Sequence, residues 1–491
     1  MNPLRLIISL ALTVSSAVSH ASIEEGLQAL KQNNYDKAIH LLRSEADGGS
    51  ALATRYLAKL YLAGNGVPQN FLEAAKLFKK AADKGDTLSE AELGSMYEHG
   101  QGVKQDYSRA AELYQGAANK GLPEAMHALS ILYDKGLGVQ RDSRRAFDLL
   151  QTAANKGNVS AQNDLAIKLM TGDGTQKDPE RAMRFFHSAA KQNDPVAQRN
   201  IGIAYAKGLG VEKNHAKAVH WYELSAKQGD VIAQIALAQT YEQGNGVAVD
   251  YTLALTWYKH AAALSNEFAN FKVGYFYWKG LGTKQNSVEA AKWLTRSADN
   301  NFPAAQTTLA LLYVNGDGVK KDDETAFRLY KKAASQNYPQ AMFELALILQ
   351  NNESPHQNFS QAAILLERLS DLGFSQAQAQ LGRLYERGLG VEKNYDQAIS
   401  LYISSANENN KLGDGLEYLG LAYEKGIGVR KNLIISYALL QNALTKSPEK
   451  TYLTERITKI SKNLSDTELE QAKVLSSKIS LEGIAVLDLK K

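Results

Sequence analysis

The stretch GLGVEKN occurs twice in this chain, at residues 208–214 and at residues 388–394. A glycine-rich stretch can cradle a phosphate, or it can mark a turn that returns with every unit of a repeating structure. The two copies begin 180 residues apart, and Gly-x-Gly also recurs every 36 residues from Gly64 to Gly316. Because 180 residues are five periods of 36, the stretch is predicted to be a turn between repeats.

Each period carries the pattern of two helices. In the unit that begins at Gly208, Asn214 can cap a following helix, on which Ala218 and Trp221 are three residues apart and share one face. Gly229 suits the left-handed residue that ends a helix. A second apolar pattern follows, with Ala, Leu and Tyr at 25, 29 and 33 residues after the first glycine. Each unit is therefore predicted to be a helical hairpin, with a first helix of about 15 residues.

Small residues inside the predicted helices indicate close packing between hairpins. Gly202 and Gly382 stand in the middle of second helices, where glycine costs about 1 kcal/mol relative to alanine, so a neighbouring helix is expected to pass too close for a side chain. A lone hairpin cannot bury both of its apolar faces, so the hairpins must stack. The predicted fold is all-α, a right-handed α-solenoid superhelix of about eleven to twelve 36-residue helix-turn-helix repeats.

The glycines of the turns are predicted to be structural, because they reverse the chain between two helices. One unit departs from the pattern: residues 350–360, QNNESPHQNFS, lack both glycines and are expected to form a degenerate turn. The clearest examples of turn glycines are Gly64, Gly66, Gly100, Gly102, Gly136, Gly138, Gly208, Gly210, Gly388 and Gly390.

The two ends of the chain differ from the repeats. Residues 1–21 have one positive charge, an apolar run and small residues near Ala21, which predicts a cleaved secretory signal peptide; an uncleaved anchor is the alternative. Residues 22–33 are expected to form a capping helix, residues 34–463 the repeat array, and residues 464–491 a C-terminal capping helix and tail. Ser465 and Glu468 have the spacing of a capping box at the start of that last helix.

Composition narrows the class of protein. The 491 residues include no cysteine, which excludes disulfide-stapled modules and lipoproteins acylated on cysteine. The formal net charge of +4 is too small for a nucleic-acid binder that neutralises phosphates. We expect an exported monomer, in a bacterial periplasm or secreted or at the cell surface, whose mature chain does not insert stably into a membrane.

The sequence lacks the usual motifs for binding nucleotides or metals. The turns never extend to G-x-G-x-x-G, and no P-loop motif occurs. His215 and His220 are five residues apart and lack the Glu-x-x-His partner of a metal site. Trp221, Trp257 and Trp293 recur at one position of three consecutive units and are interpreted as packing between helices, with a ligand-binding ladder as the alternative. We expect no cofactor, no metal and no enzymatic activity.

The repeats resemble Sel-1-like repeats, the longer relatives of tetratricopeptide repeats. Residues 97–139, YEHGQGVKQDYSRAAELYQGAANKGLPEAMHALSILYDKGLGV, match that pattern closely, and the resemblance covers roughly residues 34–446. It implies a protein-binding scaffold rather than an enzyme. Exported bacterial members act in host interaction and virulence, including binding of secretory immunoglobulin A, as periplasmic immunity proteins that neutralise secreted toxins, or in envelope and exopolysaccharide assembly. All of these roles remain open at this point.

Basic residues gather on the first helices, which line the concave surface in related solenoids. Arg144, Arg145, Arg181 and Arg184 belong to two adjacent units and are expected to lie near one another and to contact an acidic protein partner. The alternative is an ordinary solvated helix face. Further basic residues at equivalent positions include Lys76, Lys79 and Arg109.

Overall fold

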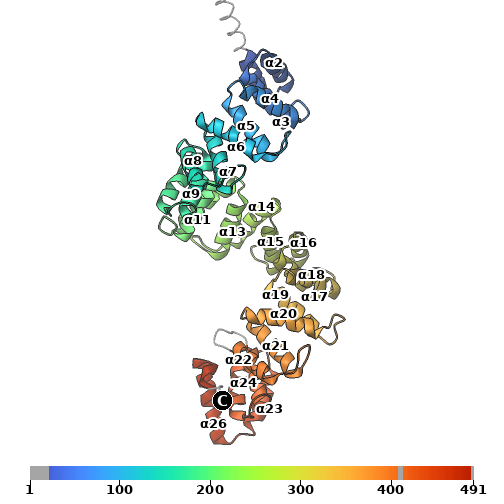
Figure 1. Ribbon diagram of the computed structural model, residues 1–491. Coiled ribbons are helices and arrows are strands. Elements are labelled where there is room, and N and C mark those ends of the chain that lie inside the picture. The colour runs from blue at the N-terminus through green and yellow to red at the C-terminus, as the bar shows by residue number, and fades with distance from the viewer. Residues whose placement is uncertain (1–21, 407–412, 488–491) are drawn as a thin grey trace, which may run out of the picture. The chain divides into compact units, whose positions relative to one another are not determined.

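The computed structural model describes residues 22–406 and 413–487, and the predicted signal peptide at residues 1–21 lies outside them. The chain divides into two compact units, unit 1 ending at Asp250 and unit 2 beginning at Tyr251. Within each unit, helices follow one another as stacked hairpins (Figure 1). The sequence does not reveal the division, because the turns that begin at Gly244 and Gly280 keep the 36-residue interval across it.

Unit 1 is an all-α stack of hairpins in the described part of the chain. Residues 22–31 are helical and precede the first hairpin. The helices that follow are α2 (Tyr35–Asp47), α3 (Ala51–Ala63), α4 (Phe71–Ala82), α5 (Thr87–His99), α6 (Tyr107–Asn119), α7 (Pro123–Lys135), α8 (Ser143–Asn155), α9 (Val159–Thr171), α10 (Pro179–Lys191), α11 (Pro195–Lys207), α12 (His215–Lys227) and α13 (Val231–Gln243).

Unit 2 continues with the same kind of hairpin and then changes at its end. Its helices are α14 (Tyr251–Ala263), α15 (Glu267–Lys279), α16 (Ser287–Asp299), α17 (Pro303–Asn315), α18 (Asp323–Ala334), α19 (Pro339–Gln350), α20 (Phe359–Asp371), α21 (Ser375–Arg387), α22 (Tyr395–Ser405), α23 (Asp414–Lys425), α24 (Leu433–Lys446), α25 (Tyr452–Ser461) and α26 (Asp466–Glu482), followed by the 3₁₀ helix η1 (Ile484–Leu487). The capping box predicted at Ser465 and Glu468 is present at the start of α26.

Two kinds of cap fix where the helices begin and end. The Asn214 side chain accepts a hydrogen bond from the Lys217 backbone N–H at the start of α12, as predicted, and such a cap stabilises a helix by about 1 kcal/mol. Gly229 has a φ of 91° just after α12, the left-handed conformation expected there. The helix between these caps has 13 residues rather than about 15, because the chain leaves the helix before Gly229.

The GLGVEKN turn is built around its two glycines. Gly208 has a φ of 72° and Gly210 a φ of 69°. A Cβ atom on Gly210 would stand 2.4 Å from the carbonyl oxygen of Pro179, so this turn packs on the first residue of the hairpin that it closes. The backbone N–H of Asn214 then donates to the carbonyl of Tyr205 at 2.9 Å. All ten turn glycines named above have positive φ values.

The unit without glycines closes by other contacts. The backbone N–H of Asn358 donates to the carbonyl of Leu349 at 2.8 Å, which is the bond that joins Asn214 to Tyr205 in the ordinary turn. The His356 imidazole stacks on the Phe327 ring with centroids 3.7 Å apart. Its Nε2 lies 2.8 Å from a carboxylate oxygen of Glu324. Side-chain contacts with α18 therefore take the place of glycine packing, and α20 begins in register.

The close helix crossings predicted from the mid-helix glycines are confirmed. A Cβ atom on Gly202 would lie 2.6 Å from the ring of Tyr222, and one on Gly382 would lie 2.5 Å from the ring of Tyr402. Both tyrosines are buried. Each glycine thus makes room for an aromatic ring from the first helix of the next hairpin.

Candidate binding face on the first helices

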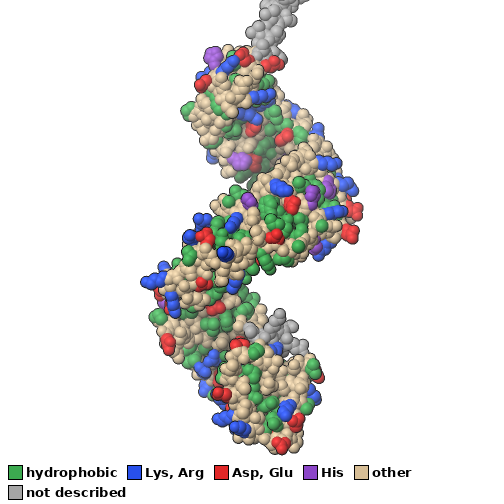
Figure 2. Space-filling model, turned by 180° about the vertical axis from the view of Figure 1, so that it is seen from behind, with side chains coloured by type: hydrophobic (Ala, Val, Ile, Leu, Met, Phe, Trp, Pro, Cys, Tyr) green, Lys and Arg blue, Asp and Glu red, His purple; other side chains and the backbone are tan. Residues whose placement is uncertain are grey.

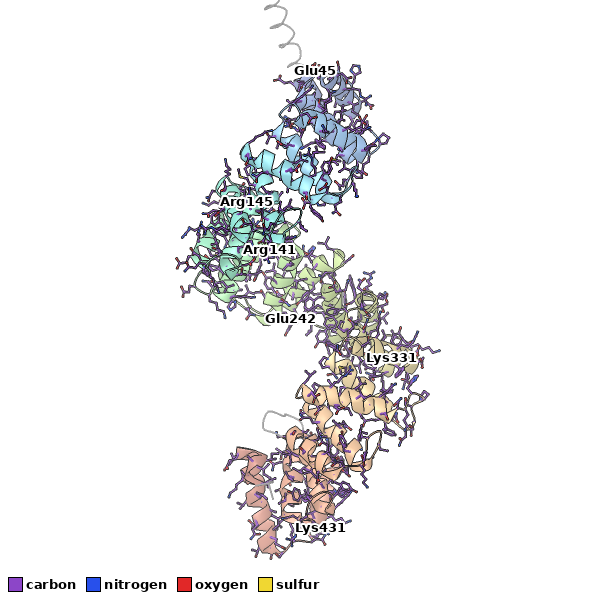
Figure 3. The ribbon with its side chains drawn as sticks, in the orientation of Figure 1. Glu45, Arg141, Arg145, Glu242, Lys331 and Lys431 are labelled. Atoms are coloured by element: carbon purple, nitrogen blue, oxygen red, sulfur yellow. The ribbon has the colours of Figure 1, made fainter. Side chains whose placement is uncertain are left out.

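The structure places Arg144 and Arg145 on α8 and Arg181 and Arg184 on α10, the first helices of two consecutive hairpins in unit 1. The Arg145 guanidinium lies 4.5 Å from the centroid of the Tyr133 ring and donates a hydrogen bond of 2.6 Å to Oε1 of Gln115. Figure 3 labels Arg145 on this part of the chain. The contacts of Arg145 therefore hold its cation over the junction of α6, α7 and α8.

The other three arginines are bound less firmly. Arg144 is 91% exposed, and its Nε lies 3.8 Å from a carboxylate oxygen of Asp148. Arg181 lies 5.8 Å from the centroid of the Phe185 ring on its own helix. Arg184 is exposed. Among the described residues, no hydrogen bond or aromatic ring bridges the pair on α8 and the pair on α10.

The basic residues on the neighbouring first helices differ, because acids on the same helix or at its end neutralise them. Lys76 lies 3.7 Å from Glu73, and Lys79 lies 2.8 Å from Asp83. Arg109 donates to Glu112 at 2.5 Å. By contrast, Arg145, Arg181 and Arg184 form no ion pair within the described residues. Three cations without an ion pair in the described part of the chain thus lie on α8 and α10. Basic and acidic side chains are interspersed over the face drawn in Figure 2.

Tyrosines near the ends of several second helices lie beside charged side chains of the first helices; in α9 the equivalent residue is Leu169. Lys217 on α12 lies 5.3 Å from the centroid of the Tyr205 ring, and Arg145 lies 4.5 Å from that of Tyr133. In unit 1, Glu223 accepts a bond of 3.2 Å from the Tyr241 hydroxyl. We call the exposed sides of the first helices, together with these rings, the first-helix face of each unit. The half-buried tyrosines of unit 1 at this position are Tyr61, Tyr97, Tyr133, Tyr205 and Tyr241.

These tyrosines were not among the predicted binding residues, although their 36-residue recurrence was visible in the sequence. The sequence carries a signal that could have identified them. The side chains nine and fifteen residues after each first glycine, which lie beside these tyrosines, are charged in several units. In unit 2 the same contact recurs, where the Lys259 ammonium donates to the Tyr277 hydroxyl at 2.9 Å. A polar ring edge next to a cation is typical of surfaces that bind protein.

The tryptophans are not fully buried, which corrects part of the interpretation as core. The Trp221, Trp257 and Trp293 side chains are each half-buried. Trp221 packs against the buried cluster of unit 1. Its ring lies edge-on to the His187 and His220 rings, with centroids 5.4 and 5.8 Å apart. These indoles stand at the border of the core because the position thirteen residues after the first glycine borders the exposed side of the first helix. Burial, with the nearby Lys191 charge, lowers the pKa of His187.

Two further clusters of charged side chains are satisfied internally. On the second helices of unit 1, the Lys168 ammonium contacts Asp134 at 3.0 Å and Asp173 at 2.9 Å. Partial burial opposes protonation of Lys168, but the bonds to Asp173 and Asp134 outweigh it, so its pKa is raised. In unit 2, Lys450 contacts the buried Glu417 at 2.7 Å. Such paired groups hold neighbouring helices together.

Metal-binding clusters and membrane-spanning helices are both absent from the described residues. No group of three or more His, Asp or Glu side chains is placed to hold a metal ion in residues 22–406 and 413–487. Within the same ranges, none of the helices combines the length and the apolar character needed to cross a bilayer.

Protein-family models and solved structures that are similar to this chain indicate its family. Among solved structures, the chain is similar to c5321, a protective antigen present in uropathogenic Escherichia coli strains displaying an SLR fold. The two chains are 31% identical, the match covers 92% of this chain and 97% of c5321, and the TM-score is 0.76. This chain is also similar to a Sel1 repeat protein from Oxalobacter formigenes, with 28% identity, 63% and 91% covered, and a TM-score of 0.50. Comparison with curated proteins returned no match.

The family models match along most of the chain. The Sel1 repeat model matches twelve times, at residues 20–50, 51–86, 87–122, 123–158, 159–194, 195–230, 231–266, 268–302, 303–338, 339–374, 375–410 and 413–447. The matched ranges continue through the unit that lacks the turn glycines, which agrees with the register kept by α20. Stacked repeats of this kind form a scaffold suited to binding protein. The chain belongs to the Sel1 repeat family.

Proposed function

We propose that this protein is an exported, monomeric scaffold that binds an acidic protein partner on the first-helix face of unit 1, in an interaction with a host. The observation that carries the proposal is the group of cations on α8 and α10. Arg145 and Arg181 contact the faces of aromatic rings rather than carboxylates. Their charge is therefore available to a partner.

The physics of association supports this surface. A guanidinium held over a ring loses less side-chain freedom on binding than a free one, so less ordering entropy opposes complex formation. Arginine and tyrosine are also over-represented among the residues that carry most of the binding energy in protein interfaces. A cluster of like charges increases the association rate with a partner of opposite charge, and salt weakens this effect.

The host-directed part of the proposal is supported by the relative c5321, whose description is a protective antigen in uropathogenic strains. The predicted signal peptide at residues 1–21 supports export. A protein recognised as an antigen must meet host molecules, so a soluble host protein with an acidic surface is the kind of partner that fits both observations.

A capture experiment tests the proposal. Residues 22–491 are immobilised and exposed to host secretory fluids and, separately, to envelope and secreted proteins of the producing bacterium. The test variant carries Arg144→Glu, Arg145→Glu, Arg181→Glu and Arg184→Glu. The matched control makes the same change of charge at exposed lysines of turns and helix ends in unit 1: Lys104→Glu, Lys135→Glu, Lys156→Glu and Lys207→Glu.

We expect a host protein to be retained at low salt by the wild type and by the control, and its affinity for the test variant to be lower by about tenfold or more. The thermal midpoint should be unchanged in the control and should fall only slightly in the test variant, because Arg145→Glu removes the surface contacts with Tyr133 and Gln115. Equal retention by the test variant would contradict the proposed face. If only bacterial envelope proteins are retained, the host-directed role is contradicted, but binding on the first-helix face is not.

A further inference from the structure

The first-helix face of unit 2 changes character at its C-terminal end. In unit 1, the side chains beside the recurring tyrosines are charged, as Lys217 is beside Tyr205. Around Tyr423, the tyrosine of the α22–α23 hairpin, the equivalent positions on α22 and α24 are occupied by Ile403 and Ile435. Three apolar or aromatic side chains thus line one place where several hairpins of unit 1 carry charge.

These side chains line a hollow of about 880 Å³. This volume lies within the range of about 300–1,000 Å³ that is usual for ligand pockets. Asp396, Ile399, Ser400, Ile403 and Ser404 come from α22 at spacings of three and four residues, so they share one face of that helix. The remaining lining residues are Tyr423, Gly428, Val429, Arg430, Lys431, Asn432, Ile435 and Leu487.

The chain itself supplies one side chain to this hollow from its C-terminal end. After α26, Gly483 has a φ of 75° and turns the chain into η1. Ile484 is 5% exposed and anchors η1 in the core of unit 2. Leu487, at the end of η1, is half-buried and reaches the hollow. An aliphatic side chain is therefore presented to the first-helix face by the chain's own end.

The charges in the wall of the hollow favour a ligand with a negative group beside its aliphatic one. Arg430 and Lys431 outnumber the one acid, Asp396. Lys431 lies in the turn before α24 and is labelled in Figure 3. A peptide with a carboxylate beside an aliphatic side chain therefore fits the charges of this wall.

We propose that this hollow is a peptide-binding site for a partner segment in which an aliphatic residue is followed by an acidic one, and that Leu487, which lines it, limits the access of such a segment. The isoleucine side chains of the wall receive the aliphatic side chain, and Arg430 and Lys431 attract the carboxylate. The site lies in unit 2 and does not depend on the arginines of unit 1, so either proposal can fail without the other.

The test uses the full chain and a labelled synthetic peptide of residues 485–491, AVLDLKK, followed by fluorescence anisotropy. Leu487→Asp in the full chain weakens the resident contact and leaves Ile484 in place. We expect this variant to bind the peptide at least about tenfold more tightly than the wild type, because the resident segment lowers the fraction of sites open to the peptide. A peptide with lysine in place of the aspartate should bind less tightly by a similar factor.

Two further variants, each combined with Leu487→Asp, locate the binding. Ile403→Asp should abolish binding by placing a charge in the apolar wall. Arg430→Glu with Lys431→Glu lies in an exposed turn segment, so it keeps the test valid if Ile403→Asp prevents folding, and it should weaken binding about tenfold. No binding of the peptide by the Leu487→Asp chain would overturn the proposal. Dimers formed by the wild type in light scattering and lost with Leu487→Asp would also overturn it, since a second copy would then supply the occupant.

Discussion

Single residues determine how closely the hairpins of this protein can approach. Gly382 faces the ring of Tyr402, which is fully buried and whose hydroxyl donates to Glu386 at 2.7 Å. The ring can therefore move little. Burial, with the nearby Glu386, raises the pKa of this hydroxyl well above its usual range. A small residue in one helix and an aromatic residue in the next thus form a matched pair.

Gly382→Ala should lower the free energy of unfolding by about 1–2 kcal/mol, because the overpacking cost exceeds the helix propensity gained. Gly116→Ala in α6 is the control. Its Cβ atom would meet the end of the Glu90 side chain, which is paired with Lys120 and can shift away more easily than a buried ring, so this change should cost clearly less than Gly382→Ala. Urea unfolding measures both. A stabilised Gly382→Ala chain would show that the crossing has room to spare.

A buried phenol makes stability depend on alkaline pH. Burial raises the pKa of Tyr222 to about 12 from its ordinary value of 10.0. The folded state therefore holds this proton more tightly, and the associated stability is complete below pH 10 and is lost as the pH rises toward 12. Tyr222→Phe should reduce the fall in unfolding free energy between pH 9 and pH 11 by about 1 kcal/mol. An unchanged pH profile in urea unfolding would contradict this assignment.

At the scale of elements, the turn determines whether the array keeps its register. The periodicity predicted the caps and the turn glycines, because each depends on one residue and its neighbours in the sequence. How residues 350–360 close without glycine could not be predicted, since the closing contacts of His356 are with Phe327 and Glu324 on another helix. The separation in sequence hides such a contact although the structure depends on it.

His356→Ala should weaken this turn by about 1 kcal/mol, because it removes the aromatic stack. Hydrogen exchange should increase at residues 351–358 and at the start of α20, whereas the ordinary turn at residues 208–214 should be unaffected. His40→Ala removes an exposed histidine from α2 and is the control. Equal exchange at residues 351–358 in the wild type and in His356→Ala would show that the Asn358 backbone bond suffices.

At the scale of the whole molecule, the 36-residue period predicted the family and the hairpin architecture, but it could not distinguish the faces of the hairpins. Tyr205 and Tyr423 each stand three residues before a turn glycine, yet Lys217 contacts the first and Ile403 and Ile435 line the hollow at the second. The four arginines were predicted from their positions on the first helices of two repeats, whereas the ring partners of Arg145 and Arg181 required the structure. Function in a repeat protein therefore lies in the departures from the repeat.

The central claim is that a partner binds the first-helix face of unit 1, and hydrogen exchange with the captured partner tests it most directly. Exchange is compared between the free and the bound chain, in the wild type and in the chain with the four arginines reversed. We predict slower exchange on α6, α8, α10 and α12 of the bound wild type. On the reversed chain, exchange should not slow at the same partner concentration. Protection confined to the second helices α7, α9 and α11, or equal protection in the reversed chain, would contradict the claim.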